Sequence, residues 1–235
     1  MNLKQNQIER AKRNAALEAV KHVKDGSIIG LGSGSTAAHA IIEIGKKAKQ
    51  EKLDILAVPT SYQAFMLAVK HGIRITTLEE HPTLDLTIDG ADQIDQKLNL
   101  IKGMGGALAR EKIVASSSEE FIVIADETKI VKTLGERNQP IPIEVLPFAA
   151  PLVMRKIGEL NGKPTIREGT KKVGPVITDN GNVIIDADFG LIHSPAELEH
   201  RLKSFAGVVE TGLFVGMTTT VYVGTGSGTE KLTRK

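Results

Sequence analysis

The sequence predicts an α/β protein with a largely parallel sheet and a small α+β domain inserted into it. Over roughly the first 130 residues, short apolar runs alternate with helical patterns, and glycine-rich turns separate them. After residue 133 the order changes to strand, helix, two strands, helix and strand. We therefore expect a Rossmann-like main domain, residues 1–132 plus 215–235, and a ferredoxin-like (βαββαβ) small domain, residues 133–214.

The elements of the main domain follow from hydrophobic spacing. Apolar residues at helical intervals from Ile8 to Val23 indicate a first helix, which Asp25-Gly26 ends. Short apolar runs indicate buried strands, and their alternation with helices favours a sheet covered on both faces. The expected strands are Ser27–Leu31, Leu53–Val58, Ile73–Thr76, Leu84–Ile88, Leu98–Lys102, Phe121–Ala125 and Thr218–Val223, and the expected further helices are Thr36–Ala48, Ser61–Lys70 and Ala107–Ser116.

The small domain is predicted in the same way. Asn180-Gly181-Asn182 is a turn signal between two of its strands. The expected strands are Ile141–Val145, Thr165–Glu168, Val183–Ala187 and Val208–Phe214, and the expected helices are Ala150–Leu160 and Pro195–Phe205. The later run Gly224–Gly228 is glycine-rich too, and we expect it to be a loop.

Composition excludes several classes of function. Thirty Lys and Arg balance 28 Asp and Glu, and Trp is absent, so neither a polyanionic partner nor a base-stacking platform is expected. The absence of Cys excludes disulfides and thiolate chemistry and fits a cytoplasmic protein. The polar N-terminus lacks a signal-peptide core, and no apolar run could span a bilayer. We expect no nucleic-acid and no membrane partner.

The first candidate site is the run Gly30-Leu31-Gly32-Ser33-Gly34-Ser35-Thr36, between a strand and a helix. Glycines let a ligand approach the backbone, and amides at a helix start favour an anion. Ser33, Ser35 and Thr36 add hydroxyl donors, so the loop suits a phosphate. The dinucleotide and P-loop fingerprints both fail here. The alternative is a tight turn with a serine cap.

Two further loops follow expected strands. Asp89-Gly90-Ala91-Asp92 places two carboxylates where open α/β sheets bind ligands, although helix-capping aspartates are equally compatible. Lys102-Gly103-Met104-Gly105-Gly106 sets a cation beside glycine amides, which suits an oxyanion. Glu111 follows on the next helix, where its neighbours Arg110 and Lys112 favour a surface position. Together these groups suit proton transfer beside the carbonyl of a phosphorylated substrate.

At these motifs the sequence resembles type A ribose-5-phosphate isomerases. The resemblance runs from GLGSGSTAAH through DGAD and KGMGGALAREK to VITDNGNVI and GLF, in the family's order and spacing. DGAD followed by KGxGG and REK is the specific part. Ser33 stands where many members have Thr, and Met104 where many have Gly. A positive φ at Met104 would cost energy.

The resemblance implies an isomerase of the non-oxidative pentose phosphate pathway that interconverts ribose 5-phosphate and ribulose 5-phosphate through an enediol. It implies Glu111 as the base, Asp89 as a proton shuttle and Lys102 as the group that offsets negative charge. It implies no cofactor, no metal and a homo-oligomer, a dimer or a tetramer. The implied substrate contacts are Ser33, Gly34, Ser35, Thr36, Asp89, Gly90, Ala91, Asp92, Lys102, Gly103, Met104, Gly105, Lys129 and Lys12.

Three other classes remain open. An amino-sugar-phosphate deaminase would share a phosphate loop but should lack the DGAD, KGxGG and REK series. A sugar-phosphate sensor would carry a DNA-binding segment, whereas only residues 1–26 precede the first expected strand. A purely structural protein would not need three polar loops at strand ends.

Overall fold

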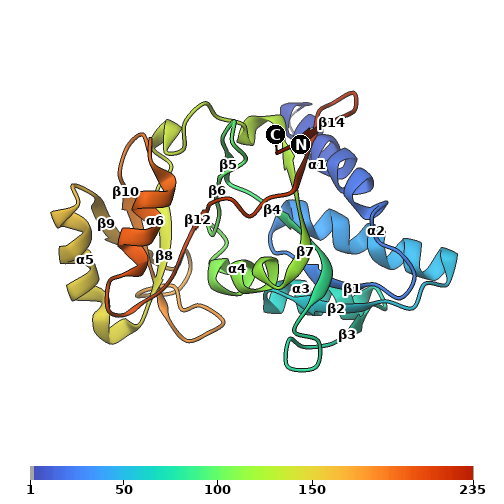
Figure 1. Ribbon diagram of the computed structural model, residues 1–235, viewed down its shortest axis with the longest axis horizontal. Coiled ribbons are helices and arrows are strands. Elements are labelled where there is room, and N and C mark those ends of the chain that lie inside the picture. Colours follow the sequence, from blue (N-terminus) through green and yellow to red (C-terminus); the bar gives the residue numbers. More distant parts are fainter. Residues whose placement is uncertain (1–2, 235) are drawn as a thin grey trace. The chain divides into compact units, whose positions relative to one another are not determined.

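A computed structural model describes residues 3–234, with side chains from residue 5 onward (Figure 1). Contacts divide the chain into two compact units. Among the described residues, unit 1 holds 3–91, 110–130 and 217–234, and unit 2 holds 92–109 and 131–216. The sequence predicts which segments fold together as domains, with 133–214 as the small domain. That division stays a prediction.

Unit 1 is built on a seven-stranded sheet with the order β14-β13-β7-β4-β1-β2-β3. Every neighbouring pair is parallel except β13 and β14, which are antiparallel. The predicted α/β architecture with a largely parallel sheet is therefore confirmed. The strands are β1 (Ile28–Leu31), β2 (Leu56–Pro59), β3 (Arg74–Ile75), β4 (Leu84–Gly90), β7 (Ser118–Asp126), β13 (Thr220–Gly224) and β14 (Thr229–Thr233).

Helices cover both faces of this sheet. Ile29 and Leu31 of β1 belong to a core cluster that includes residues of α1 (Leu3–Val20), α2 (Ser35–Glu51) and α3 (Tyr62–Lys70). Side chains alternate along a strand, so residue 30 faces the other way. There α4 (Leu108–Ser116) packs so closely that an added Cβ on Gly30 would lie 2.5 Å from Val114.

The strand order creates a switch point between β1 and β4. The chain adds β2 and β3 on one side of β1, and then β4, β7 and β13 on the other. This is the order of doubly wound folds, in which ligands bind outside the carboxyl ends of the strands where the order reverses. Leu31 pairs with Ile88, so the two strands end side by side. The loop after β1 and the last residues of β4 therefore occupy the position expected for a ligand site.

Unit 2 contains an antiparallel sheet with the order β11-β8-β10-β9. Alternate side chains of its strands form an apolar cluster with α5 and α6, which includes Ile143, Ile185 and Leu202. The element order is the split βαβ order expected from the sequence. The elements are β8 (Ile141–Val145), α5 (Ala150–Glu159), β9 (Lys163–Ile166), β10 (Val183–Asp188), α6 (Pro195–Lys203) and β11 (Val208–Thr211).

Unit 2 also holds a three-stranded sheet of β5 (Gln93–Ile94), β6 (Leu100–Ile101) and β12 (Leu213–Phe214). The expectation of one strand over Val208–Phe214 is wrong, because the chain changes sheets at Gly212. The Gly212 N–H donates to the Pro142 carbonyl oxygen at 2.7 Å, and its own carbonyl accepts from Lys102 N–H at 2.8 Å. Residues 225–228 form the turn between β13 and β14, and β14 was not anticipated.

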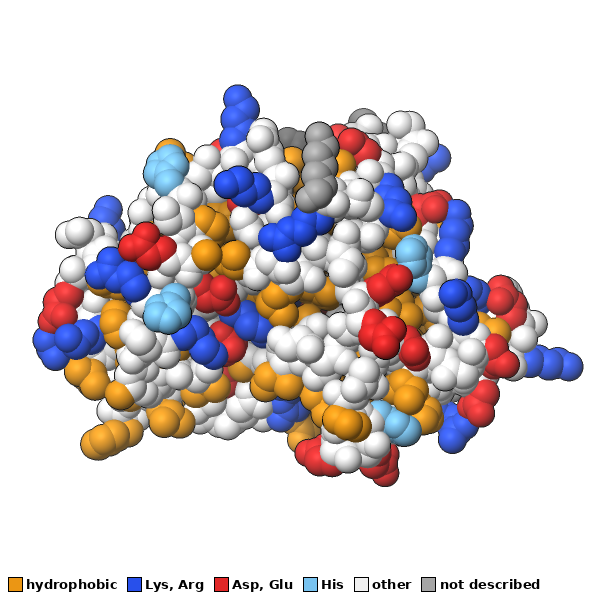
Figure 2. All heavy atoms as spheres, in the orientation of Figure 1, with side chains coloured by type: hydrophobic (Ala, Val, Ile, Leu, Met, Phe, Trp, Pro, Cys, Tyr) orange, Lys and Arg blue, Asp and Glu red, His pale blue; other side chains and the backbone are white. Residues whose placement is uncertain are grey.

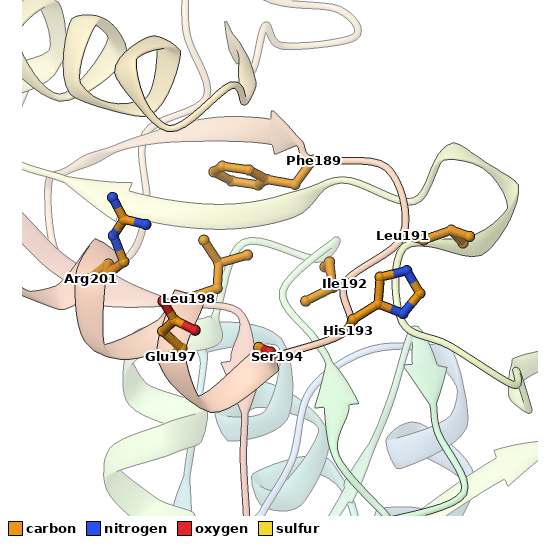
Figure 3. A pocket seen from close by; sticks show the side chains of 8 residues that line it. All are labelled: Phe189, Leu191, Ile192, His193, Ser194, Glu197, Leu198 and Arg201. Carbon is orange, nitrogen blue, oxygen red and sulfur yellow. The ribbon is translucent and has the colours of Figure 1, made fainter.

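Among residues 3–234, no helix is both long and apolar enough to cross a membrane. On the face seen in Figure 2, acidic and basic side chains are interspersed rather than segregated by sign. Figure 3 shows a pocket on unit 2 beside α6, where Phe189, Ile192 and Leu198 lie near His193 and Arg201. No predicted site residue lines this pocket.

Candidate functional site

The β1–α2 loop lies directly against Asp89. Gly32 N–H donates to the Ile88 carbonyl at 2.9 Å, and Ser33 N–H donates to Asp89 Oδ1 at 3.1 Å. An added Cβ on Gly32 would lie 2.0 Å from Asp89 Oδ1 and 2.5 Å from its Cα. Only glycine therefore allows the loop to close over the carboxylate.

Helix α2 begins without a side-chain cap, since its N-cap is Gly34. The first-turn amides, from Ser35 to Ala37, have no acceptor within the helix. An anion placed there would accept hydrogen bonds from these amides and would lie at the positive end of the helix dipole. Ser35 is exposed and Thr36 is half-buried. This arrangement suits a phosphate better than the alternative of a serine-capped turn.

Some polar groups of the β1–α2 loop form hydrogen bonds with neighbouring residues of the protein. The Ser33 hydroxyl lies 2.8 Å from Thr60 Oγ1 and donates to Ser61 Oγ at 2.5 Å. Gly34 N–H donates to Gln63 Oε1 at 2.8 Å. Sequence reasoning missed these three supports, although Thr60 and Ser61 lie where the expected strand Leu53–Val58 gives way to the next expected helix. These contacts hold the loop's shape and do not involve the side chains of Ser35 and Thr36.

Lys12 brings a cation to the same helix start. Its Nζ donates to Ser35 Oγ at 3.1 Å and to Glu9 Oε1 at 2.7 Å. His39 Nε2 lies 3.0 Å from Glu9 Oε2. The hydrogen bond from Lys12, and then that from His39, lowers the pKa of Glu9. Glu9 therefore orients the ammonium group of Lys12 beside the β1–α2 loop.

Asp89 and Asp92 lie in different settings. Strand β4 continues through Gly90, so Asp89 is a fully buried strand residue of unit 1, and its Oδ1 also accepts Gly90 N–H at 2.7 Å. Asp92 begins the next part of unit 2, where its Oδ2 accepts Met104 N–H at 3.0 Å. No helix begins between residues 89 and 101, so the alternative of helix-capping aspartates is wrong. Ala91, between them, is half-buried.

Glu111 is buried, with 4% of its surface exposed, and so is Lys112. The surface position suggested by the flanking cations is therefore wrong. Glu111 lies in the first turn of α4, where the helix dipole favours a carboxylate. Burying a carboxylate costs free energy unless its environment compensates the charge. Glu111 is therefore a candidate catalytic residue rather than a solvent-exposed surface charge.

The second glycine-rich loop belongs to unit 2. Lys102 is 3% exposed, and its ammonium group lies 5.4 Å from the centroid of the Phe214 ring. Met104 and Gly105 are exposed. The positive φ angles of this loop fall on Gly103 and Gly106, and Met104 is not among the described residues with positive φ. The departure from glycine at Met104 therefore costs no backbone strain of that kind.

Lys129 ends a short 3-10 helix, Glu127–Lys129, immediately after β7. Its side chain is half-buried. Because β7 pairs in parallel with β4, Lys129 follows a strand end next to that of Asp89. The predicted site residues come from both units. Unit 1 contains Lys12, Ser33–Thr36, Asp89, Gly90, Glu111 and Lys129, and unit 2 contains Asp92 and Lys102–Gly105.

Fold and loops define a class, the doubly wound α/β proteins whose ligand sites lie at the carboxyl ends of their strands. The comparisons identify the family within this class. The family model for ribose 5-phosphate isomerase A (phosphoriboisomerase A) matches residues 56–228. The chain belongs to the ribose 5-phosphate isomerase A family.

Individual relatives agree over most of the chain. It is 51% identical to ribose-5-phosphate isomerase A of Methanosarcina acetivorans, over 94% of this chain and 93% of that one. It is 44% identical to ribose-5-phosphate isomerase of Homo sapiens, over 97% of this chain and 74% of that one. The solved structure of ribose 5-phosphate isomerase A from Methanocaldococcus jannaschii matches with a TM-score of 0.92 at 47% identity, over 96% and 99%. A D-ribose-5-phosphate isomerase in complex with phospho-erythronic acid matches with a TM-score of 0.94 at 45% identity, over both full chains.

The contact between Gly32 and Asp89 yields a stability prediction. Gly32→Ala should lower the free energy of unfolding by about 1–3 kcal/mol or more, because overpacking here forces backbone apart. Gly158→Ala is the matched control, since it adds a methyl group to an exposed helix position with no atom within 4 Å. The control should leave stability unchanged or raise it. Urea unfolding of both variants measures this, and equal stabilities would contradict the close approach.

Proposed function

We propose that this chain interconverts D-ribose 5-phosphate and D-ribulose 5-phosphate, the isomerase reaction of the non-oxidative pentose phosphate pathway. Family membership supports the reaction, because the relatives carry this activity in their names. The observation that carries the mechanism is the burial of Glu111, which places a carboxylate out of water in an isomerase scaffold. An aldose–ketose isomerisation needs one such base and no redox cofactor.

The substrate's phosphate binds at the start of α2. Ser35 and Thr36 provide hydroxyl and amide donors there, and Lys12 provides the cation, as its contact with Ser35 supports. Ser33 and Gly34 shape the loop. Gly90, Ala91, Gly103, Met104, Gly105 and Lys129 complete the proposed substrate contacts. The relative that holds phospho-erythronic acid binds a molecule with the same phosphate chemistry.

The reaction itself is a pair of proton transfers on the ring-opened sugar. Glu111 removes the proton on C2 of the aldose, and the electron pair moves to the carbonyl oxygen to form an enediolate. Glu111 then returns the proton to C1. Asp89 moves the hydroxyl proton between the two oxygens, Asp92 orients a hydroxyl, and Lys102 stabilises the developing negative charge. No atom is gained or lost, and the base ends as it began.

The assembly and location are further parts of the proposal, and they rest on the resemblance to the family rather than on the chain's own geometry. We propose a cytoplasmic homo-oligomer, a dimer or a tetramer, that takes a small sugar phosphate as its partner and neither nucleic acid nor membrane. Sedimentation equilibrium of the full chain measures the oligomeric state directly. A monomer at all concentrations would remove this part of the proposal without affecting the reaction.

Thr36→Val tests the phosphate loop. The variant keeps the shape of the side chain and loses one hydroxyl donor, and a charge-assisted hydrogen bond is worth about 1.5–3 kcal/mol. The KM for ribose 5-phosphate should therefore rise about ten-fold or more. Thr170→Val, at an exposed position of unit 2, is the control and should not change KM. Equal turnover of unphosphorylated ribose by the unmodified chain would show that this loop is not a phosphate site.

Glu111→Gln tests the base. Glutamine keeps the size of the side chain but accepts no proton from carbon, and a positioned general base contributes about 10²–10⁴-fold. The kcat should fall at least about 100-fold on that figure, with little change in substrate affinity. Glu119→Gln, an exposed carboxylate on β7, is the matched control. If Glu111→Gln keeps near-normal turnover, Asp89 becomes the next candidate for the base.

Dialysis tests the expectation that no metal takes part. Among the described residues, no cluster of three or more His, Cys, Asp or Glu side chains could hold a metal ion. With a carboxylate base and a lysine cation, activity should survive dialysis against a chelator. Loss of activity that a single divalent ion restores would overturn the metal-free mechanism.

A further inference from the structure

The loop Lys102–Gly106 is shaped by the strands of unit 2. Gly103 has a φ of +101°, and an added Cβ there would lie 2.8 Å from Leu108 Cβ and 3.2 Å from Pro142 Cβ. Lys102 N–H donates to the Gly212 carbonyl at 2.8 Å, and Gly212 N–H donates to the Pro142 carbonyl at 2.7 Å. The start of the loop is therefore held against β8 and the β11–β12 junction.

Arg167, just beyond β9, holds the middle of the same loop. Its Nη1 donates to the carbonyl oxygens of Gly103 at 3.0 Å and Met104 at 2.9 Å. Its Nε donates to Asp186 Oδ2 at 2.8 Å, and its Nη2 donates to Asp186 Oδ1. The two side chains are largely buried, with 13% and 20% exposed. This fork of donors is specific to arginine, because lysine is a point charge without fixed directions.

The two carbonyl contacts determine where the next amides point. In a planar trans peptide, the C=O of one residue and the N–H of the next point in opposite directions. Holding the Gly103 carbonyl therefore directs the Met104 N–H, which meets Asp92 Oδ2 at 3.0 Å. Holding the Met104 carbonyl directs the Gly105 N–H away from Arg167 in the same way. Asp92 and Gly105 are both proposed substrate contacts.

We propose that Arg167 and Asp186 form a positioning pair that sets the geometry of the loop Lys102–Gly105 for catalysis. This inference rests on the proposed isomerase function. Asp186 holds the Arg167 guanidinium in place, and the guanidinium holds the two peptide planes that follow Gly103 and Met104. The first plane directs the Met104 N–H toward Asp92, and the second sets the direction of the Gly105 N–H. The pair orients the carboxylate of Asp92, which positions a substrate hydroxyl, and the Gly105 amide, so it acts on the alignment of the reacting sugar rather than on the binding of its phosphate.

Arg167→Gln and Arg167→Lys separate this role from a simple need for positive charge. Misplacing reacting groups by about 1 Å can cost about 100-fold in rate, so kcat should fall about 10- to 100-fold in both variants. The KM for ribose 5-phosphate should change by less than about three-fold, because the phosphate is proposed to bind at the start of α2, which Arg167 does not contact. Full rescue by lysine would overturn the proposal. Arg155→Gln, which removes an exposed arginine paired with Glu159 on α5, is the matched control and should keep full activity.

Asp186 provides a second route to the same conclusion. Asp186→Asn should lower kcat with KM nearly constant, and adding it to Arg167→Gln should cause little further loss, because residues that act as one unit are not additive. Independent losses that multiply would contradict a shared role. Thermal unfolding of every variant reports any general loss of structure.

Hydrogen exchange at the amides of Met104 and Gly105 gives a readout that needs no activity. These amides should exchange faster in Arg167→Lys than in the unmodified chain, while amides of β7 stay unchanged. If the unmodified chain does not isomerise ribose 5-phosphate, the proposed function fails, and this exchange still decides whether Arg167 orders the loop. Unchanged exchange together with unchanged kcat would exclude the positioning role.

Discussion

The site depends on the close approach of the β1–α2 loop to Asp89. Parallel strands β1 and β4 lie side by side, and the backbone after β1 must bend across the carboxylate of Asp89, next to the last residue of β4. A side chain at Gly32 would occupy the space of that carboxylate. This one contact links the helix start that suits a phosphate to a buried acid, and it places both at the switch point of the sheet. Lys12 of α1, together with Ser61 and Gln63 at the start of α3, then adds support.

The small antiparallel sheet has a clear physical relation to the chemistry. A loop with three glycines in five residues has many accessible conformations, and ordering it costs entropy. Unit 2 offsets this cost through contacts from Pro142, Gly212 and Arg167. The sheet therefore serves as a rigid support for one loop. Sites on rigid supports hold their groups more precisely than sites on free loops.

Much of the fold was predictable because buried helices and strands show runs or regular spacings of apolar residues in the sequence. Phe121–Ala125 and Ile141–Val145 were found from apolar content alone. Strand β7 starts at Ser118, three residues before the expected start at Phe121, because its first residues are polar and show no apolar pattern. The two-residue strand β5 and the polar β14 were missed, and Leu213–Phe214 of β12 was merged with β11 into one expected strand. Their pairing is decided by distant partners rather than by local pattern.

The candidate site was predictable where motifs carry it and not elsewhere. Glu111 illustrates the limit, since its charged neighbours favour the surface while the packing of α4 buries it. Arg167 and Asp186 illustrate another, because 19 residues separate them and no motif joins them. Lys12 gained its position from a contact with Ser35, 23 residues away. Such long-range partners are properties of the fold and not of any local stretch of sequence.

The edges of the large sheet have a consequence for solubility. An edge strand offers unpaired backbone groups to any other chain, and proteins blunt this risk with short strands and lysines. One edge here is β3, which has only two residues, and Arg74 there pairs with Asp54. The other is β14, where Lys231 lies 5.9 Å from the centroid of the Tyr222 ring on β13. The apolar parallel strands between them are thus shielded from strand-to-strand aggregation by a very short strand on one side and a charged one on the other.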